Sequence, residues 1–239
     1  MNNLLGFTIR SHGGLANWIK FQTVSAHLIV EGLTWVRKQQ SGLISNTNVT
    51  IETDKQLVSF QPTYADWYTL FDTNHVTIFS KNEEIIEELV NPRLSFSGHK
   101  RETTWTRLQA FYFASYAIWI YFNAPFCFVN PDFEVTEIEP WDENGEQFRR
   151  LQVVFPERIA THSRIQTFYI DSTGLIRRHD YNVEISENVA SAHYLYNYTE
   201  VQGIKFPTKR KVFVRNQDNT AQQPEPLLIS IDINEITLK

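Results

Sequence analysis

The sequence predicts an α+β fold in which one large, curled antiparallel sheet wraps around a single apolar helix. The stretch Thr103–Phe128 holds about 18 consecutive residues of helical character that are apolar on every side of the helix. The chain on both sides of this stretch alternates between polar and apolar residues in about eleven short strands joined by turns. A sheet of that size usually curls. Because no composition shift or repeat divides the chain, residues 1–239 are expected to form one domain.

The chain begins with a short helix in this prediction. Leu15, Trp18 and Ile19 recur at helical spacing, which favours a helix over about Gly14–Phe21. A long alternating strand over about Thr23–Trp35 follows it. Further short strands are expected over Thr47–Thr53, Gln56–Gln61, Trp67–Phe71 and His75–Phe79, whereas Glu83–Leu89 fits either a strand or a helix.

The central helix has a signal at each end. Thr103 or Thr104 can cap its first free N–H groups and Pro125 stops it, which places the helix over about Thr104–Phe122. Charged residues are absent from Ala110–Pro131, but the run is too short and too polar for a membrane span. A buried helix is expected, which either fills a closed core or lines an apolar cavity. The residues on the face expected to line such a cavity are Trp105, Tyr112, Tyr116 and Trp119.

After the helix, the pattern is that of strands throughout. Turns at Asp142–Gly145 and Asp171–Gly174 join two hairpins, and Asn216–Pro226 is a polar loop. The strands expected here are Phe133–Trp141, Gln147–Phe155, Thr161–Ile170, Leu175–Ile185, Ala192–Val201, Lys205–Val214 and Leu227–Leu238.

Composition excludes several classes of protein. The net charge is −5, whereas nucleic-acid-binding domains normally carry a basic surplus, so no nucleic-acid partner is expected. Cys127 is the only cysteine, so the chain can form neither an internal disulfide nor a cysteine-based metal site. The first residues lack the basic start and apolar run of a secretory signal, which predicts a cytoplasmic location.

The hairpin Thr161–Ile185 is the part of the chain richest in candidates for chemistry. If its loop has four residues, Gln166 pairs with His179 and Arg164 pairs with Tyr181. This register depends on the loop length, because a slip of one residue turns every side chain of a strand to the other face. The residues that would share one face of the sheet are His162, Arg164, Gln166, Arg177, His179 and Tyr181.

The spacing of the histidines disfavours a metal site. The expected register places His193 opposite Val183, about 10 Å from His162, with His179 about 13 Å along the strand. These separations are too long for one shared ion, so neither a metal nor another cofactor is expected. His179 and Asp180 point to opposite faces of their strand and cannot form a catalytic pair. Either His162 or His179 alone could still act as an acid or base, because histidine titrates near neutral pH.

Two sets of residues resemble known families. The motif His12-Gly13-Gly14-Leu15-x-x-Trp18 near the start, and Gly203-Ile204-Lys205-Phe206-Pro207 near the end, resemble the outer-membrane lipoprotein carrier group (LolA/LolB-like). That resemblance implies a half-open antiparallel barrel whose concave, apolar side is closed by a helix and takes acyl chains. The middle of the chain is similar to a set of uncharacterised bacterial proteins, which implies no particular activity. The residues that carry this second resemblance include Trp141, Asn144-Gly145-Glu146, Phe155-Pro156, Ile159–Ser163 and Gly174–Tyr181.

The sequence thus favours a soluble protein that binds an apolar or amphipathic, lipid-like small molecule on the concave side of the sheet. The four aromatic residues of the helix face would contact the ligand, with Arg164 and His179 at the mouth of the cavity. Tyr116→Asp would then abolish ligand binding and leave the fold intact. Two alternatives stay open: an enzyme that uses His162 or His179 as acid or base on such a ligand, and a structural or partner-binding domain with a filled core.

Overall fold

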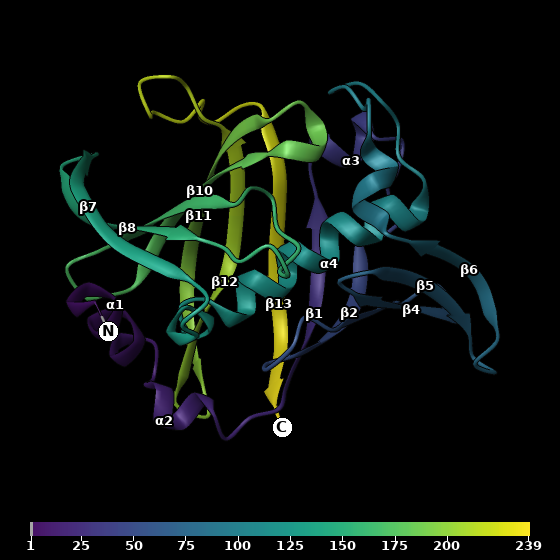
Figure 1. Cartoon of the computed structure of the whole chain (residues 1–239), viewed down its shortest axis with the longest axis horizontal. Helices are drawn as coiled ribbons and strands as arrows, with labels where there is room; N and C mark the ends of the chain where they lie inside the picture. The colour runs from purple at the N-terminus through teal and green to yellow at the C-terminus, as the bar shows by residue number, and fades with distance from the viewer. Residues whose placement is uncertain (1) are drawn as a thin grey trace.

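The computed structural model describes residues 2–239, and its strands form one antiparallel sheet (Figure 1). The strands are β1 (Thr23–Glu31), β2 (Asn46–Glu52), β3 (Val58–Pro62), β4 (Trp67–Asp72), β5 (His75–Ser80), β6 (Ile85–Val90), β7 (Glu134–Glu143), β8 (Glu146–Val154), β9 (Ile165–Ile170), β10 (Ile176–Val183), β11 (Val189–Val201), β12 (Ile204–Val214) and β13 (Leu227–Leu238). Their order across the 13-stranded sheet is β6-β5-β4-β3-β2-β1-β13-β12-β11-β10-β9-β8-β7.

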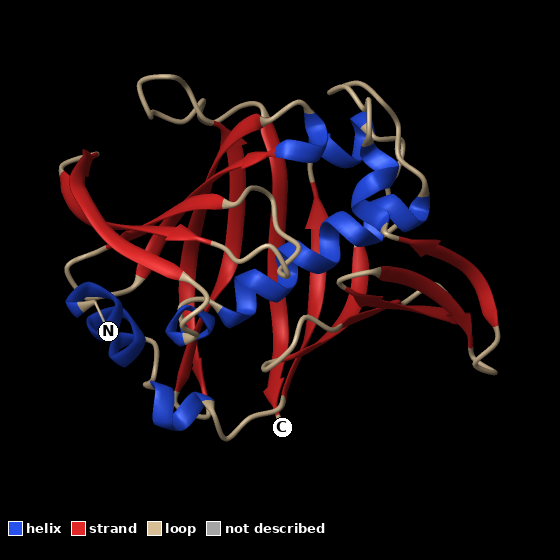
Figure 2. Ribbon diagram, in the orientation of Figure 1, coloured by secondary structure: helices blue, strands red, loops and turns tan. Residues whose placement is uncertain are grey.

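The sheet curls around helix α4 (Arg107–Asn123), which crosses its concave side (Figure 2). Paired strands are also neighbours in the chain, apart from β1 and β13, which pair at the centre of the sheet. The predicted α+β class, with a large curled antiparallel sheet and one central helix, is confirmed. The sheet has 13 strands instead of about eleven, and the ambiguous segment before the central helix is the edge strand β6.

Helix α4 begins later than predicted. Its N-cap is Thr106 in place of Thr103 or Thr104: the Thr106 hydroxyl accepts from Gln109 N at 3.2 Å, and Gln109 Oε1 accepts from Thr106 N at 3.0 Å. The helix ends at Asn123, and all its residues after the first are buried. A surface that is apolar on every side is therefore matched by packing on every side. No helix among residues 2–239 is both long and apolar enough to cross a membrane.

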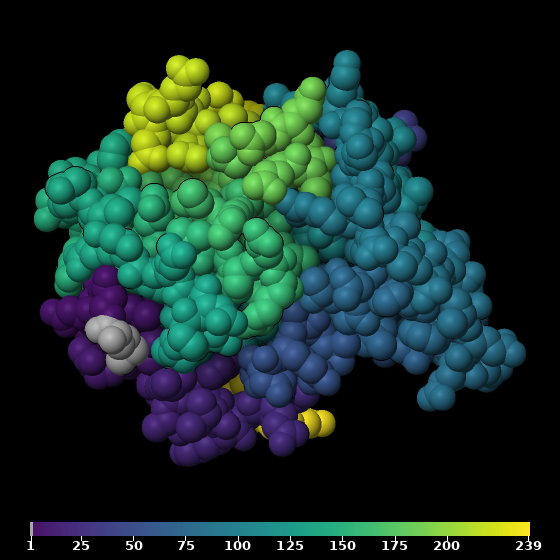
Figure 3. Space-filling model, viewed as in Figure 1, coloured from purple at the N-terminus to yellow at the C-terminus, as the bar shows by residue number. Residues whose placement is uncertain are grey.

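The chain begins with two short helices where one was predicted. Helix α1 (Asn3–Ser11) precedes the expected Gly14–Phe21 and packs beside β8, where purple and teal surfaces meet in Figure 3. Helix α2 (Leu15–Trp18) covers only the first part of the expected range. Between the two helices, Gly13 packs against the β11–β12 hairpin, and a Cβ atom there would lie 2.1 Å from Gly203 O. The glycine pair after α1 therefore marks a close approach of two backbones.

We expect Gly13→Ala to lower the free energy of unfolding by about 1–3 kcal/mol more than Gly14→Ala does. Both glycines have positive φ angles, 117° and 84°, so both variants carry the backbone cost of a side chain there. Only Gly13 faces the Gly203 carbonyl, whereas a Cβ atom on Gly14 meets nothing within 4 Å. Urea unfolding of both variants measures the difference, and equal losses would contradict the close approach.

Strand β1 is shorter than the predicted Thr23–Trp35. It ends at Glu31, and Gly32, with φ of 125°, turns the chain into helix α3 (Leu33–Arg37). A Cβ atom on Gly32 would lie 2.4 Å from Leu228 O, so the chain needs a glycine where it passes β13. This turn sets α3 beside β13, where it forms one wall of the pocket described below.

A buried ion-pair network lies on the face of β10 that points away from α4. Arg178 is only 1% exposed and donates to the two carboxylate oxygens of Asp180 at 2.7 and 2.8 Å and to Glu143 at 3.1 Å. Its guanidinium also lies over the rings of Tyr169 and Tyr194, 4.7 and 5.4 Å from their centroids. The network links β7, β9, β10 and β11 through a single arginine.

Candidate functional site

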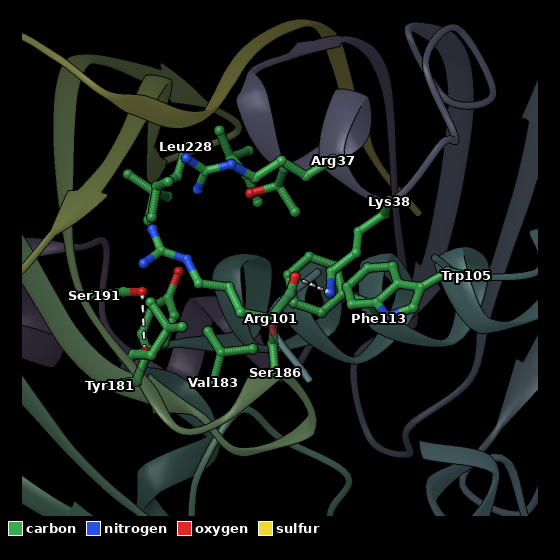
Figure 4. A pocket seen from close by; sticks show the side chains of 14 residues that line it. Arg37, Lys38, Arg101, Trp105, Phe113, Tyr181, Val183, Ser186, Ser191 and Leu228 are labelled. Carbon is green, nitrogen blue, oxygen red and sulfur yellow. Dashed lines mark hydrogen bonds between the residues drawn. The ribbon is translucent and has the colours of Figure 1, made fainter. Parts of the chain in front are cut away.

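A pocket opens between helix α3, the chain just before α4, and strands β10–β13 (Figure 4). Its volume is about 50 Å³. The walls are mostly apolar: Trp105 and Phe113 lie on the helix side, and Val189, Val212 and Leu228 come from the sheet. The pocket is an opening between the concave face of the sheet and the N-terminal part of α4.

Three basic side chains line the same pocket. Lys38 is almost fully buried, and its ammonium donates to the carbonyl oxygens of Arg101 and Thr103 at 2.8 and 3.1 Å. Burial lowers the pKa of Lys38. Arg37 and Arg101 form no ion pair with any carboxylate of residues 2–239, and Figure 4 shows both reaching toward the same side of the pocket. Two such guanidinium groups at an apolar opening are suited to hold an anionic group.

The ligand contacts predicted from the sequence do not meet in one cavity. Trp105 lines the pocket of Figure 4. Tyr112 and Arg164 line a second, wider opening of about 460 Å³. Trp119 borders a third opening of about 620 Å³, and its indole N–H donates to two backbone carbonyls at 2.8 Å. Tyr116 lies in the interior with none of its surface exposed. Arg37 and Arg101, which define the candidate site, were not predicted.

The wider openings differ from the candidate site in their charges. In the second opening, Arg93 and Arg164 each pair with a glutamate. In a further opening, of about 1000 Å³, Arg149 and Arg177 also have carboxylate partners. The arginines of these openings are therefore already paired with carboxylates, whereas Arg37 and Arg101 of the smaller pocket in Figure 4 form no ion pair within residues 2–239.

The β9–β10 hairpin has a different register from the predicted one. Ile170 lies opposite Ile176, so the loop holds one residue more than assumed. A bulge in β10 then places His179 opposite Phe168, and the predicted pairing of His179 with Gln166 was wrong.

The six polar residues expected on one face of this hairpin are divided by the new register. Arg164 is exposed to solvent, and Arg177 pairs with Asp171 at 2.5 Å beside the turn. The expectation that Arg164 and His179 stand together at one mouth was therefore wrong, because His179 is buried. The four that are buried are His162, Gln166, His179 and Tyr181.

Strand β11 adds a third histidine to this buried set. His193 lies opposite His179, not opposite Val183 as predicted. The ring centroids of His179 and His193 are 5.8 Å apart, so the expected separation of about 13 Å was wrong. Within residues 2–239, no three His, Cys, Asp or Glu side chains are grouped so that they could hold a metal ion.

A hydrogen-bonded network connects these residues to α4. The hydroxyl groups of Tyr116 and Tyr121 lie 3.2 and 3.1 Å from the two ring nitrogens of His162. The Tyr121 hydroxyl also shares a hydrogen bond of 3.0 Å with that of Tyr181. The ring of His162 stacks on Tyr181 with centroids 3.9 Å apart. The hydroxyl groups that Tyr116 and Tyr121 bring into the core are in this way paired with other buried polar groups.

His162 and His179 are neutral in this environment. Burial lowers the pKa of both rings well below the ordinary value of histidine. Gln166 Oε1 accepts a hydrogen bond from His179 Nε2 at 2.6 Å, which places the proton of that ring on Nε2. Both rings are at most 2% exposed, so the arrangement is that of a packed polar core and not of an acid or base open to a substrate.

Comparison with known proteins finds the fold but no sequence relative. No family model matches the chain, and no curated protein matches it. A LolA superfamily protein from Nitrosomonas europaea has a similar structure, with a TM-score of 0.51 and 10% identity over 97% of this chain and 93% of that one. This chain has the LolA fold. A putative outer membrane lipoprotein-sorting protein domain from Vibrio parahaemolyticus gives 0.52 at 8% identity over 99% and 91% of the two chains.

A DUF1329 family protein from Desulfovibrio piger is also similar in structure to this chain, with a TM-score of 0.51 and 10% identity over 99% and 92% of the two chains. The fold implied by the first resemblance is confirmed. The two motifs that carry it contact each other in the structure, because Gly13 lies against Gly203 and Lys205 N donates to His12 O at 3.0 Å. The likeness concerns the fold alone, so function must be argued from the site.

Proposed function

We propose that this LolA-fold protein binds an amphipathic molecule with an anionic head group at the pocket of Figure 4. The observation that carries the proposal is the pair Arg37 and Arg101, two guanidinium groups without a carboxylate partner in residues 2–239, at the opening of an apolar pocket. The head group would accept hydrogen bonds from both arginines. The apolar part would lie against Trp105 and Phe113.

The size of the pocket sets a condition on this binding. A volume of about 50 Å³ holds about three to five water molecules. An acyl chain therefore needs space that side chains fill in the structure. Helix α3 is only 5 residues long and the chain before α4 is a loop, so these two segments would move aside when such a chain enters. The protein would then act as a carrier whose entrance opens at α3.

We expect Arg37→Ala and Arg101→Ala each to weaken binding of a fluorescent fatty acid about 10–100-fold, because each removes a charge-assisted hydrogen bond. A dansyl-labelled fatty acid is the probe, titrated by fluorescence. Its methyl ester, which has no charge, should bind the wild type and both variants about equally. Arg158→Ala is the matched control, since Arg158 is exposed and pairs with Asp132 away from the pocket.

Native mass spectrometry with solvent extraction of the purified protein tests the proposal without a chosen probe. A co-purifying amphiphile supports it. Equal affinity for the acid and its ester would contradict the role of the arginines. A clean mass with no binding of either probe would instead favour the alternative of a domain with a filled core, and attention would pass to protein partners.

A further inference from the structure

A second basic group is buried without a counter-ion, at a pocket that shares no lining residue with the one above. Arg210 on β12 is 2% exposed and forms no ion pair within residues 2–239. Burial lowers its pKa to about 10, and the groups that oppose this effect are tyrosines, not carboxylates. Its Nε atom is buried and has no hydrogen-bond partner. Buried charges in proteins are normally paired, so this one requires an explanation.

A neighbouring histidine also lacks hydrogen-bond partners. His193 on β11 has no exposed surface, and neither of its ring nitrogens has a hydrogen-bond partner among residues 2–239. In the ladder between β11 and β12, Leu195 lies opposite Arg210, so His193 and Arg210 are diagonal neighbours on the concave face. Both lie against Tyr121, whose ring centroid is 4.5 Å from that of His193 and 4.9 Å from Arg210 Cζ. Two side chains with unsatisfied hydrogen-bonding groups thus lie next to each other in the core.

The role of Arg210 at the end of α4 accounts for only part of this arrangement. Its Nη2 atom donates to Tyr121 O at 2.7 Å, which is one of the last carbonyls of the helix and has no partner within it. The negative end of the helix dipole favours a cation at this position. That contact leaves Arg210 Nε and both nitrogens of His193 unused.

A small pocket of about 20 Å³ lies beside Arg210. Its lining includes His179, Tyr198 and Lys205, and no carboxylate among residues 2–239 lines it. The volume suits one particle about the size of a water molecule. A phosphate or sulfate is too large for it. An anion is favoured over water because the lining holds two basic side chains, Arg210 and Lys205, and no carboxylate of residues 2–239.

We propose that this pocket binds one small monovalent anion, of the size of chloride, held by the Arg210 guanidinium in a lining that contains Lys205 and no carboxylate of the described residues. The anion would neutralise the buried charge beneath the end of α4. This site is separate from the pocket of Figure 4, and either can exist without the other.

Bromide is the probe for this site. In crystals soaked in sodium bromide, anomalous scattering should show a peak within hydrogen-bonding distance of Arg210. In solution, bromide at ten times its Kd should raise the Tm of the wild type by about 3–6 °C relative to sodium gluconate of equal concentration, because gluconate is too large to enter. Formate in place of bromide tests whether a carboxylate is also accepted.

Arg210→Met should abolish the bromide-specific rise in Tm. Arg158→Met is the control, because Arg158 is exposed and should leave the rise unchanged. The soaked wild-type crystal decides the question even if the Arg210 variant does not fold. No bromide peak beside Arg210, together with equal Tm values in bromide and gluconate, would mean that Arg210 serves only the end of α4.

Discussion

Tyr116→Asp is expected to prevent folding, not merely to abolish ligand binding. Tyr116 has no exposed surface, and its hydroxyl lies 3.2 Å from His162 Nδ1. Removal of a large buried ring costs about 3–5 kcal/mol, and burial of an unpaired carboxylate adds several kcal/mol. Together these costs approach the whole stability of an ordinary domain, about 5–15 kcal/mol. Tyr116, which the sequence predicted to line a cavity, is part of the core.

Tyr116→Phe is the matched variant for this prediction. It keeps the ring and removes one hydrogen bond, so it should cost about 1–3 kcal/mol and remain folded. Far-UV circular dichroism and urea unfolding of both variants provide the measurement. A soluble Tyr116→Asp protein with a native spectrum and a cooperative transition would show that water reaches this position, and the closed core described above would be incorrect.

Arg178→Met should lower the free energy of unfolding by about 3–5 kcal/mol at neutral pH. The variant leaves the carboxylate of Asp180, which is 3% exposed, without the guanidinium that donates to both its oxygens. Arg149→Met is the control, because Arg149 makes a similar paired contact with Glu137 on the surface, and that variant should lose only about 0–1 kcal/mol. Equal losses in urea unfolding would contradict a buried network.

The pH dependence gives an independent check on Arg178→Met. Burial already raises the pKa of Asp180 in the wild type, although hydrogen bonds from Arg178 oppose the effect. Without Arg178 that pKa rises further above its value in the unfolded chain. A carboxyl group with a raised pKa takes up a proton more readily when folded, so folded stability gains as pH falls toward that pKa. The deficit of the variant should therefore shrink on acidification from neutral pH.

The central helix and the sheet could be predicted because their signals are local. A run without charges before Pro125 can only be buried or span a membrane, and strands joined by turns such as Asn144-Gly145 mark antiparallel hairpins. The helix α3 was missed because the alternating pattern of β1 continues past Gly32. What ends the strand there is the carbonyl of Leu228, which approaches from the far end of the chain.

The candidate site could not be predicted for the same physical reason. Arg37 and Arg101 are far apart in the chain, and each stands in an ordinary polar surrounding, so no spacing connects them. They meet because the turn at Gly32 sets α3 beside β13. His179 was misplaced because the β9–β10 loop is one residue longer than assumed and β10 has a bulge. His193 was misplaced because the register between β10 and β11 differs from the predicted one.

The pairing of β1 with β13 bears on how the chain reaches this structure. Every other pair in the sheet joins strands that follow each other, so two meanders, β1–β6 and β7–β13, can form from hairpins that close in microseconds. The two meanders pair with each other only through β1 and β13. These strands are far apart in the sequence, so bringing them together has the largest entropy cost of loop closure in the sheet. During synthesis on the ribosome, α4 emerges long before β13 is available to pair with β1. Residues of α4 that face β3–β5, such as Phe111, can pack at once, whereas Tyr121 must wait for His193 on β11 and Arg210 on β12.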